Sequence, residues 1–295
     1  MKAIEMVGII PCGGLATRIA PLPCSKEILP VGLQQNEQGL LRPKVVSHHL
    51  LEKMRHGGVE KVFFILRKGK WDIPDYYGDG SSIGLHLAYL VASLPFGPPY
   101  TLDQAYPFVR DKHVALGFPD ILFEPDDAFR RAFQRLKETR ADIVLGVYRL
   151  HDTQPSDMVA TDRTGRVREM IIKPYRKKLK WGWMFAVWTP VFTEFMHEYL
   201  KQPRTSGQLP GATLPEELTM GHVLDASLGR GIRIQSLFFR RQPYLDIGTP
   251  EGLRQVYAGS WNRLPPFTLP KQEMPESLPK AGVFLPFPEE DDKRP

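Results

Sequence analysis

The residues best suited to chemistry gather in one loop near the N-terminus. Gly13 and Gly14 follow a short apolar run, and Thr17, Arg18 and Lys26 come soon after them. Glycines let backbone N–H groups approach phosphate oxygens closely, and a guanidinium and an ammonium can neutralise a polyphosphate. The spacing matches neither the Walker loop nor the glycine pattern of dinucleotide-binding folds. Taken alone, the loop predicts either a triphosphate site or a tight turn with two solvated cations.

The elements that must position this loop predict an α/β layered fold. Apolar runs typical of buried strands cover residues 6–10, 62–66, 85–91, 113–116, 143–148, 183–188 and 232–239. Helical spacing or helix-start residues occur at 46–54, 126–136, from 190 onward and at 249–257, and residues 158–172 read as a hairpin. The glycine loop follows the first of these strands. In open α/β sheets, ligands bind at the carboxyl ends of the strands.

Composition narrows the class of protein. The 295 residues carry a net charge of +6, but the basic residues are scattered apart from the run at 173–180. No nucleic-acid-binding motif is present, so we expect phosphorylated metabolites and not nucleic acid as partners. Two cysteines are too few for a disulfide framework, and no stretch reaches the roughly 18 apolar residues of a membrane span. These features predict a cytoplasmic protein without membrane contact.

The last part of the chain differs in composition from the rest. Prolines recur every few residues from Leu264 onward, and residues 289–292 are acidic. Such a segment cannot continue the alternation of strands and helices. The sequence therefore predicts a catalytic domain over residues 1–262 and a proline-rich tail over residues 263–295. A homo-oligomer is compatible with this organisation.

The glycine loop and the blocks that follow it resemble the sugar-phosphate nucleotidyltransferases, typified by glucose-1-phosphate thymidylyltransferase. The first block runs from Pro11 to Leu22, and the second is Ser25-Lys26-Glu27-Ile28-Leu29-Pro30-Val31. The later blocks occur in the family's order: Gly78-Asp79-Gly80-Ser81, Leu116-Gly117 with Asp120, Lys173-Pro174, Gly182, and Tyr244-Leu245-Asp246-Ile247-Gly248-Thr249. The resemblance implies a three-layer α/β/α, Rossmann-like nucleotidyltransferase domain with a mixed, mostly parallel sheet.

The same resemblance implies a reaction. A nucleotidyl group would pass from a nucleoside triphosphate to a sugar 1-phosphate, or to an analogue such as a cyclitol phosphate, with release of pyrophosphate. The catalytic residues would be Arg18, which would grip the leaving pyrophosphate, and Lys26, which would contact the α-phosphate and the attacking phosphate. The residues expected to bind substrate are Gly13, Gly14, Thr17, Lys173 and Gly182.

By resemblance, Asp120 and Asp246 match two aspartates that hold Mg²⁺ in the family. In-line attack on phosphorus brings anions together, and a hard cation on carboxylates offsets their repulsion. We expect the two carboxylates to lie within about 6 Å of each other, since both would bind one ion. We also expect Arg18 and Lys26 to line this cleft without salt bridges to acids, because a paired cation is less available to phosphate.

Several departures from the family pattern concern the choice of ligands. Ala16 replaces a glycine of the loop, and Phe118-Pro119 is an insertion before Asp120. Residues that would hydrogen-bond base or sugar are replaced by Ala92, Thr101, Ile121, Met158 and Ile172. An apolar pocket discriminates far less than a hydrogen-bonding one. These changes predict poor use of glucose 1-phosphate with dTTP, and a preference for another acceptor, another base, or both.

Two alternatives remain open from the sequence. One keeps the fold but takes a non-sugar phosphate such as phosphocholine, with CTP as the donor. The other is a catalytically silent subunit that senses nucleotide sugars. Silent subunits usually lack one of the charged groups, whereas Arg18, Lys26, Asp120 and Asp246 are all present here.

Overall fold

The structure is a computed structural model. It describes residues 5–35, 39–92, 97–150, 156–172, 180–201, 218–259 and 261. The chain divides into two compact units, Met1–Asn262 and Arg263–Pro295, and every described residue belongs to the first. The Lys173-Pro174 block of the sequence analysis lies outside the described residues.

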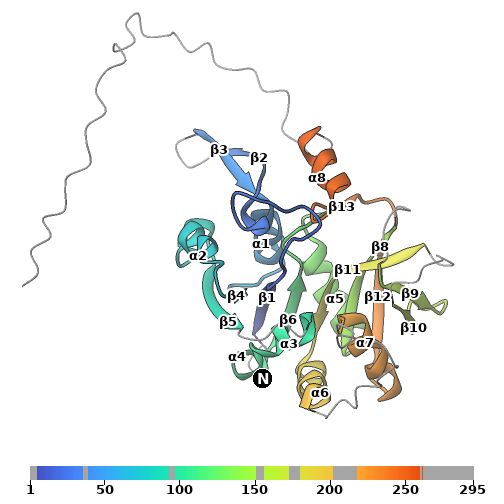
Figure 1. The fold of residues 1–295 in the computed structure, drawn as a ribbon. Coiled ribbons are helices and arrows are strands. Elements are labelled where there is room, and N and C mark those ends of the chain that lie inside the picture. Colours follow the sequence, from blue (N-terminus) through green and yellow to red (C-terminus); the bar gives the residue numbers. More distant parts are fainter. Residues whose placement is uncertain are drawn as a thin grey trace, which may run out of the picture. The chain divides into compact units, whose positions relative to one another are not determined.

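A central sheet runs through the first unit (Figure 1). Its main path joins β10 (Val167–Ile171), β9 (Met158–Thr161), β11 (Trp181–Trp188), β6 (His113–Gly117), β1 (Met6–Cys12), β4 (Lys61–Arg67) and β5 (His86–Ala92). A branch from β11 adds β8 (Ile143–Arg149) and β12 (Ile234–Phe239). The pairs β6–β1, β1–β4, β4–β5 and β8–β12 are parallel, while β11 is antiparallel to its neighbours. The predicted mixed, mostly parallel sheet is confirmed.

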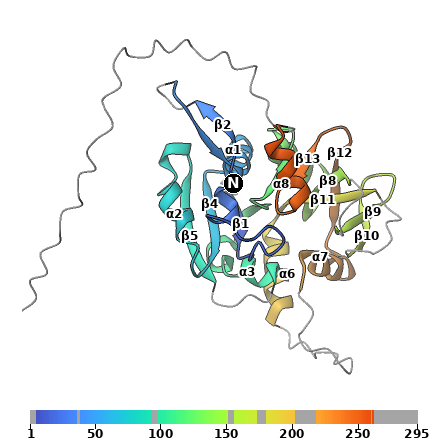
Figure 2. The ribbon, with the colours of Figure 1, turned by 45° about the horizontal axis from the view of Figure 1, so that its top comes forward.

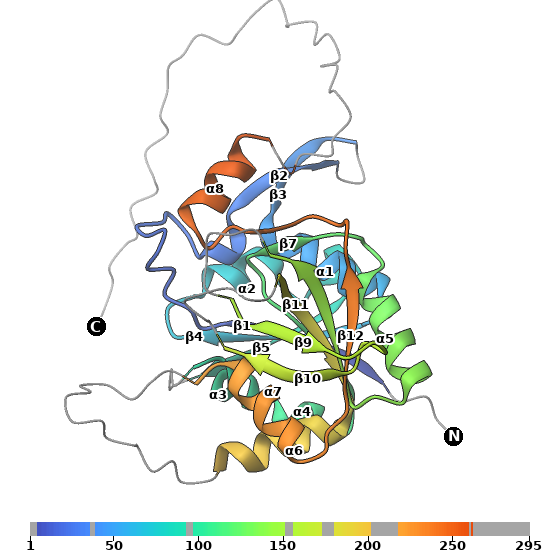
Figure 3. The ribbon, with the colours of Figure 1, turned by 90° about the vertical axis from the view of Figure 1, so that its right-hand side faces the viewer.

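Helices cover both faces of the sheet and complete the predicted three layers (Figure 3). Residues of α1 (Val46–His56), α2 (Asp72–Tyr77) and α5 (Ala128–Thr139) share one hydrophobic core. Those of α3 (Pro98–Asp103), α4 (Tyr106–Val109), α6 (Pro190–Lys201) and α7 (Met220–Gly229) share a second core. The helical periodicity explains this burial. In α5, the buried residues are Ala128, Phe129, Ala132, Phe133 and Leu136, and the last four form the apolar face expected from their spacing.

Smaller elements lie beyond one edge of the sheet. A hairpin joins β2 (Pro30–Gln35) to β3 (Leu41–Val45), and β7 (Ile121–Phe123) pairs with β13 (Tyr244–Asp246). Two 3₁₀ turns, η1 (Lys26–Ile28) and η2 (Ser81–Ile83), and the helix α8 (Pro250–Tyr257) complete the unit. Figure 2 shows α8 beside β13. Residues from β2, β7 and α8 pack together in a third, smaller apolar cluster, so this region is a packed part of the domain.

No helix in the described part of the chain is both long and apolar enough to cross a bilayer.

Candidate active site

The carboxyl ends of two adjacent parallel strands carry the predicted loop and the first predicted aspartate. β1 and β6 pair in parallel register from Met6–His113 to Ile9–Leu116. β1 ends at Cys12, directly before Gly13, and β6 ends at Gly117, shortly before Asp120. The glycine loop and Asp120 therefore emerge at the same edge of the sheet, where α/β folds bind their ligands.

The short β7–β13 sheet brings Asp246 to Asp120. Asp246 pairs with Ile121 in the antiparallel register, and the backbone N–H of Ile247 donates to the carbonyl oxygen of Asp120 at 2.9 Å. A Cβ atom placed on Gly248 would lie 2.6 Å from Oδ2 of Asp120 and 3.0 Å from Oδ1 of Asp246. The two carboxylate oxygens are thus separated by no more than the sum of these distances, which lies within the expected separation of about 6 Å.

The two predicted cations lie in this cluster, but they are not unpaired as expected. Nζ of Lys26 donates to Oδ2 of Asp120 at 2.6 Å, and a guanidinium nitrogen of Arg18 lies 3.6 Å from Oδ2 of Asp246. The expectation of cations without acidic partners is wrong. Lys26 pairs with an acid because it is buried. The side chains of Lys26 and Asp120 are only 15% and 12% exposed, and isolated charges there would lose hydration without compensation.

The pKa values of the two aspartates shift in opposite directions. Burial disfavours the charged form of Asp120, but the nearby Lys26 outweighs it and lowers the pKa of Asp120. Burial likewise opposes the charge of Lys26, yet Asp120 raises its pKa overall. Burial and the negative charge of Asp120 raise the pKa of Asp246, although Arg18 acts in the opposite direction. A divalent cation between the two carboxylates would stabilise both as anions.

The donor set fits Mg²⁺. This ion commonly takes one or two protein carboxylates and completes its shell with water and substrate phosphates. Among the described residues, no group of three or more His, Cys, Asp or Glu side chains gathers as a metal cage. Asp120 and Asp246 supply two carboxylates, the number that this ion commonly takes, and Gly248 beside them has no side chain that would collide with them.

The glycine loop gives close backbone access to the same cluster. A Cβ on Gly14 would lie 3.7 Å from Nζ of Lys26, and one on Gly13 would lie 3.5 Å from Oγ1 of Thr101. Gly14 and Thr17 are exposed, so their backbone can meet a ligand. Ala16, at the position of a family glycine, has a φ of 55°, in the left-handed region that favours glycine. The loop thus keeps the glycine conformation with an alanine.

The acceptor side is only partly described. Gly182 is buried in β11, where it pairs with Met158 of β9 and Tyr148 of β8. Its neighbour Trp183 contacts Phe118 of the insertion, with ring centroids 5.5 Å apart. Gly182 and the insertion therefore adjoin each other next to the site, whereas Lys173 lies outside the described residues.

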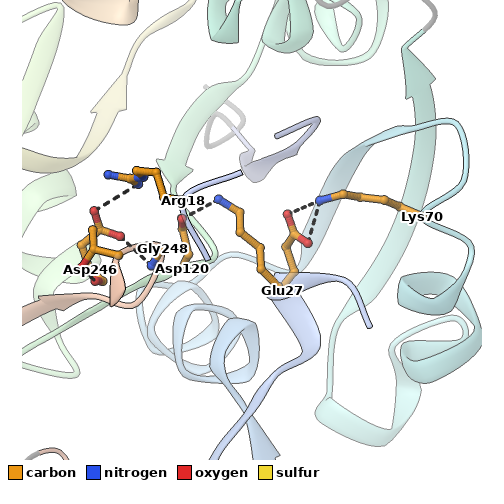
Figure 4. Close-up of polar contacts among 8 residues, drawn as sticks. Arg18, Glu27, Lys70, Asp120, Asp246 and Gly248 are labelled. Atoms are coloured by element: carbon orange, nitrogen blue, oxygen red, sulfur yellow. Dashed lines mark hydrogen bonds and ion pairs between the residues drawn. The ribbon is translucent and has the colours of Figure 1, made fainter. Parts of the chain in front are cut away.

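Sequence reasoning missed a group of residues behind Lys26. Figure 4 shows Glu27 and Lys70 on the far side of the cluster from Arg18 and Asp246. The carboxylate of Glu27 accepts two hydrogen bonds from Nζ of Lys70, at 2.6 and 2.8 Å. One signal for Glu27 was visible in the sequence, because it is a charged residue in a segment that otherwise becomes apolar. Lys70 carries no such signal.

A separate groove of about 720 Å³ lies between α5, β12 and the β9–β10 turn. Four arginines line it, and they are Arg131, Arg135, Arg163 and Arg240. None of the predicted site residues that the structure describes lines this groove. The groove is therefore separate from the edge where β1, β6 and β13 end, at which Arg18, Lys26 and the two aspartates gather.

Comparison with known proteins identifies relatives of this chain. The family model described as nucleotidyl transferase matches residues 7–260. Glucose-1-phosphate thymidylyltransferase of Neisseria gonorrhoeae is 26% identical over 262 residues, covering 85% of this chain and 81% of that protein. The low-salt glycan biosynthesis nucleotidyltransferase Agl11 of Haloferax volcanii is 24% identical over 176 residues, covering 57% of this chain but only 45% of that protein.

A solved structure shares the fold. UDP-glucose pyrophosphorylase complexed with UDP-glucose superposes with a TM-score of 0.70 at 15% identity, covering 88% of this chain and 99% of that chain. The match to the family model contains the glycine loop, Lys26 and both aspartates within its bounds. The resemblance found in the ordered sequence blocks is thereby confirmed, and the chain belongs to the nucleotidyl transferase family.

Proposed function

We propose that this protein transfers a nucleotidyl group from a nucleoside triphosphate to a sugar 1-phosphate or a close analogue, forming a nucleoside-diphosphate sugar and pyrophosphate. The observation that carries the proposal is the convergence of two cations and two carboxylates beside the glycine loop. The Neisseria gonorrhoeae relative, named glucose-1-phosphate thymidylyltransferase, supports a sugar phosphate as acceptor. A phosphocholine acceptor or a silent sensing subunit is not favoured by the relatives found.

The reaction needs positioning and charge neutralisation more than covalent chemistry. An oxygen of the acceptor phosphate forms a bond to the α-phosphorus, and the bond from that phosphorus to the bridging oxygen of pyrophosphate breaks. Lys26 would contact the α-phosphate and the attacking phosphate. Arg18 has a side chain that is 53% exposed, which suits a group that turns from Asp246 to the leaving pyrophosphate.

Asp120 and Asp246 would hold Mg²⁺, which when bound supplies positive charge against the repulsion between the reacting phosphates. The two cations would then exchange their carboxylate partners for phosphate oxygens. In the protein alone, the Lys26–Asp120 pair keeps the lysine charged and held beside the two aspartates. Each aspartate thus has two uses, holding a cationic side chain before binding and a metal ion afterwards.

The altered residues favour a substrate pair other than glucose 1-phosphate with dTTP. Met158 is fully buried opposite Gly182, and the ring of Phe118 packs against Trp183 at a tilted angle. Thr101 is buried against the first glycine of the loop. Apolar surface at such positions removes hydrogen bonds that would otherwise select one sugar or base. Lys173, if it serves as in the family, would bind the acceptor phosphate.

The proposal is tested by measuring pyrophosphate release with ATP, GTP, CTP, UTP and dTTP against a panel of sugar 1-phosphates, cyclitol phosphates and phosphocholine, with Mg²⁺ present. We expect the highest kcat/KM with a sugar or cyclitol phosphate as acceptor, in a substrate pair other than dTTP plus glucose 1-phosphate. Highest activity with dTTP plus glucose 1-phosphate would contradict the specificity proposal. Activity with phosphocholine alone, or with no acceptor, would contradict the reaction proposed.

Substitution of the two aspartates separates their roles. Asp120→Asn and Asp246→Asn should each lower kcat by about 100-fold or more, since both remove charge from the metal pair. Asp246 is the more exposed, so its variant should keep the wild-type melting temperature, whereas Asp120→Asn should lower it by leaving Lys26 buried without its anion. Steady-state kinetics over a range of Mg²⁺ concentrations and thermal denaturation provide the measurements. Wild-type turnover in either variant would remove that residue from the metal site.

A further inference from the structure

A fully buried ion pair lies directly behind Lys26. Glu27 is 0% exposed and Lys70 is 6% exposed, and both carboxylate oxygens of Glu27 accept a hydrogen bond from Nζ of Lys70. In Figure 4, the Glu27–Lys70 pair lies at one side of the cluster, and Asp120 lies at the other, next to Arg18 and Asp246. The charges of Glu27 and Lys70 have no part in the reaction described above, so their place in the interior needs another explanation.

Stability is a weak explanation for such a pair. Removing two charges from water is expensive, and replacement of a buried ion pair by apolar side chains of similar volume is often neutral or stabilising. The pKa of Glu27 reflects that cost: burial raises it, even though Lys70 opposes the rise. What a buried, hydrogen-bonded pair can supply is a defined geometry, because any movement would leave a charge uncompensated.

The segment around Glu27 is held at further points. The backbone N–H and the hydroxyl of Ser25 each donate to the carboxylate of Asp72, both at 2.7 Å. The hydroxyl of Ser47, in α1, donates to the carbonyl oxygen of Glu27 at 2.6 Å. Lys70 lies in the connection between β4 and α2, and Asp72 is the first residue of α2, so one short stretch of chain holds the segment on either side of Lys26.

The local backbone links the direction of Glu27 to that of Lys26. Both residues belong to the 3₁₀ turn η1, in which successive side chains point about 120° apart. When the carboxylate of Glu27 is fixed in the interior, the side chain of Lys26 leaves the turn in another direction, toward the aspartates. There its Nζ reaches Asp120 at 2.6 Å. Rotation of η1 about its axis would move both side chains together.

We propose that the Glu27–Lys70 pair, together with Asp72, is a positioning device that sets the orientation of Lys26 in the active site. The inference rests on the proposed function, because it assigns importance to the place of the lysine that would meet the α-phosphate. The ion pair is the inner anchor, and the Ser25–Asp72 bonds are the outer one. A displacement of about 1 Å at a reacting group can cost about 100-fold in rate.

The test replaces the pair without leaving a lone buried charge. In the full-length double variant Glu27→Met/Lys70→Met, two side chains of similar volume remove both charges. We expect a melting temperature equal to or above that of the wild type, kcat lower by at least about 10-fold, and a smaller change in KM for the triphosphate. Lys70→Arg keeps a cation that can bind the carboxylate through two hydrogen bonds, so it should retain most of the turnover.

A second readout does not depend on activity. Acetylation of surface amines, followed by mass spectrometry of the peptide containing Lys26, reports how well Asp120 protects that amine. Labelling of Lys26 should rise several-fold in the double variant and remain low in Lys70→Arg. If the double variant fails to fold, Asp72→Ala, which removes only the outer anchor, should show the same changes to a smaller degree.

Lys53 offers a matched control. It is a buried lysine in α1, 4% exposed, and its ionic partners are Asp126 and Glu124 instead of residues in the segment 25–27. Lys53→Met should lower the melting temperature while kcat and Lys26 labelling stay at wild-type values. Wild-type kcat and wild-type labelling in a folded double variant would overturn the proposal. If the wild-type protein itself shows no nucleotidyl transfer, the proposed function fails, and the labelling result alone decides the positioning role.

Discussion

At Gly248 a single methyl group would collide with the centre of the site. A Cβ there would lie 2.6 Å from Oδ2 of Asp120 and 3.1 Å from a guanidinium nitrogen of Arg18. Gly248→Ala should therefore push the carboxylate aside and lower kcat by about 100-fold, with a small effect on the melting temperature. Gly229→Ala is the control, because a Cβ at that position would meet no described atom within 4 Å apart from its chain neighbours and the backbone of its own helix. Equal kcat values in the two variants would mean that the cluster tolerates this displacement.

Ala16 illustrates a different kind of constraint, on the backbone instead of the side chain. Its φ of 55° costs a non-glycine residue about 1–2 kcal/mol. Glycine would avoid this cost, but part of the gain in stability would be lost because glycine gives the unfolded chain more conformational freedom. Ala16→Gly should raise the free energy of unfolding by about 0.5–1 kcal/mol. Ala16→Val should lower it, because a β-branched residue fits this conformation poorly. Urea denaturation of both variants measures the difference, and a less stable glycine variant would be the contrary result.

The sequence could predict which residues meet in the site, but not how they pair. Arg18, Lys26, Asp120 and Asp246 lie in blocks whose order and spacing resemble a family, and the structure brings them together. Their ion pairs depend on burial and on side-chain directions in three dimensions, which no local pattern carries. The Glu27–Lys70 contact joins residues 43 positions apart, and a lone lysine in a connection gives no sign of it.

At the scale of elements, long apolar runs were predicted well and short elements were missed. The predicted strand at 143–148 corresponds to β8, in which six of seven residues are buried. β7 and β13 have three residues each, too few to show any periodicity, although they unite the two aspartates. The β2–β3 hairpin is largely exposed, so it has no continuous apolar run. The closing helix begins as predicted, with the Thr249 hydroxyl accepting a hydrogen bond from the Gly252 N–H.

Helix α1 contains a titratable group that should make stability depend on pH. Burial, with a further contribution from Lys44, lowers the pKa of His49 to about 3, and Nε2 of His49 has no hydrogen-bond partner among the described residues. The pKa of His49 in the folded state is depressed below the unfolded value of about 6.5. Above pH 6.5 this histidine is therefore neutral in both the folded and the unfolded state, and its titration does not change the free energy of unfolding. Between pH 6.5 and 3 the unfolded state binds the proton more tightly, and stability falls as the pH falls.

His49→Leu removes this titration. Between pH 7 and pH 5 the wild type should lose about 2 kcal/mol more than the variant, from about 1.4 kcal/mol per pH unit below pH 6.5. Urea denaturation at the two pH values measures the loss in each protein. His56→Gln, at an exposed position of the same helix, is the matched control. Parallel pH curves for wild type and His49→Leu would show that His49 is not the group responsible.

At the scale of the whole molecule, the catalytic role of residues 1–262 stays a prediction, as do the cytoplasmic location and the oligomeric state. The described site is built entirely from the unit Met1–Asn262. A chain ending at residue 262 should therefore keep the kcat and melting temperature of the full-length protein. Loss of turnover in a folded truncated chain would mean that residues 263–295 contribute to the reaction.

The β7–β13 pairing also has a consequence for synthesis on the ribosome. Asp120 and Asp246 meet through strands that belong to distant parts of the chain, and β13 is followed only by α8 among the described elements. Long-range pairing of this kind forms late in folding, because the intervening chain must first be closed into a loop. At about 5–20 residues per second, a nascent chain would spend several seconds with β1, β6 and Lys26 outside the ribosome before β13 emerges. Translation thus postpones activity until nearly the whole domain is complete, and a chain released before β13 would lack one of the two aspartates.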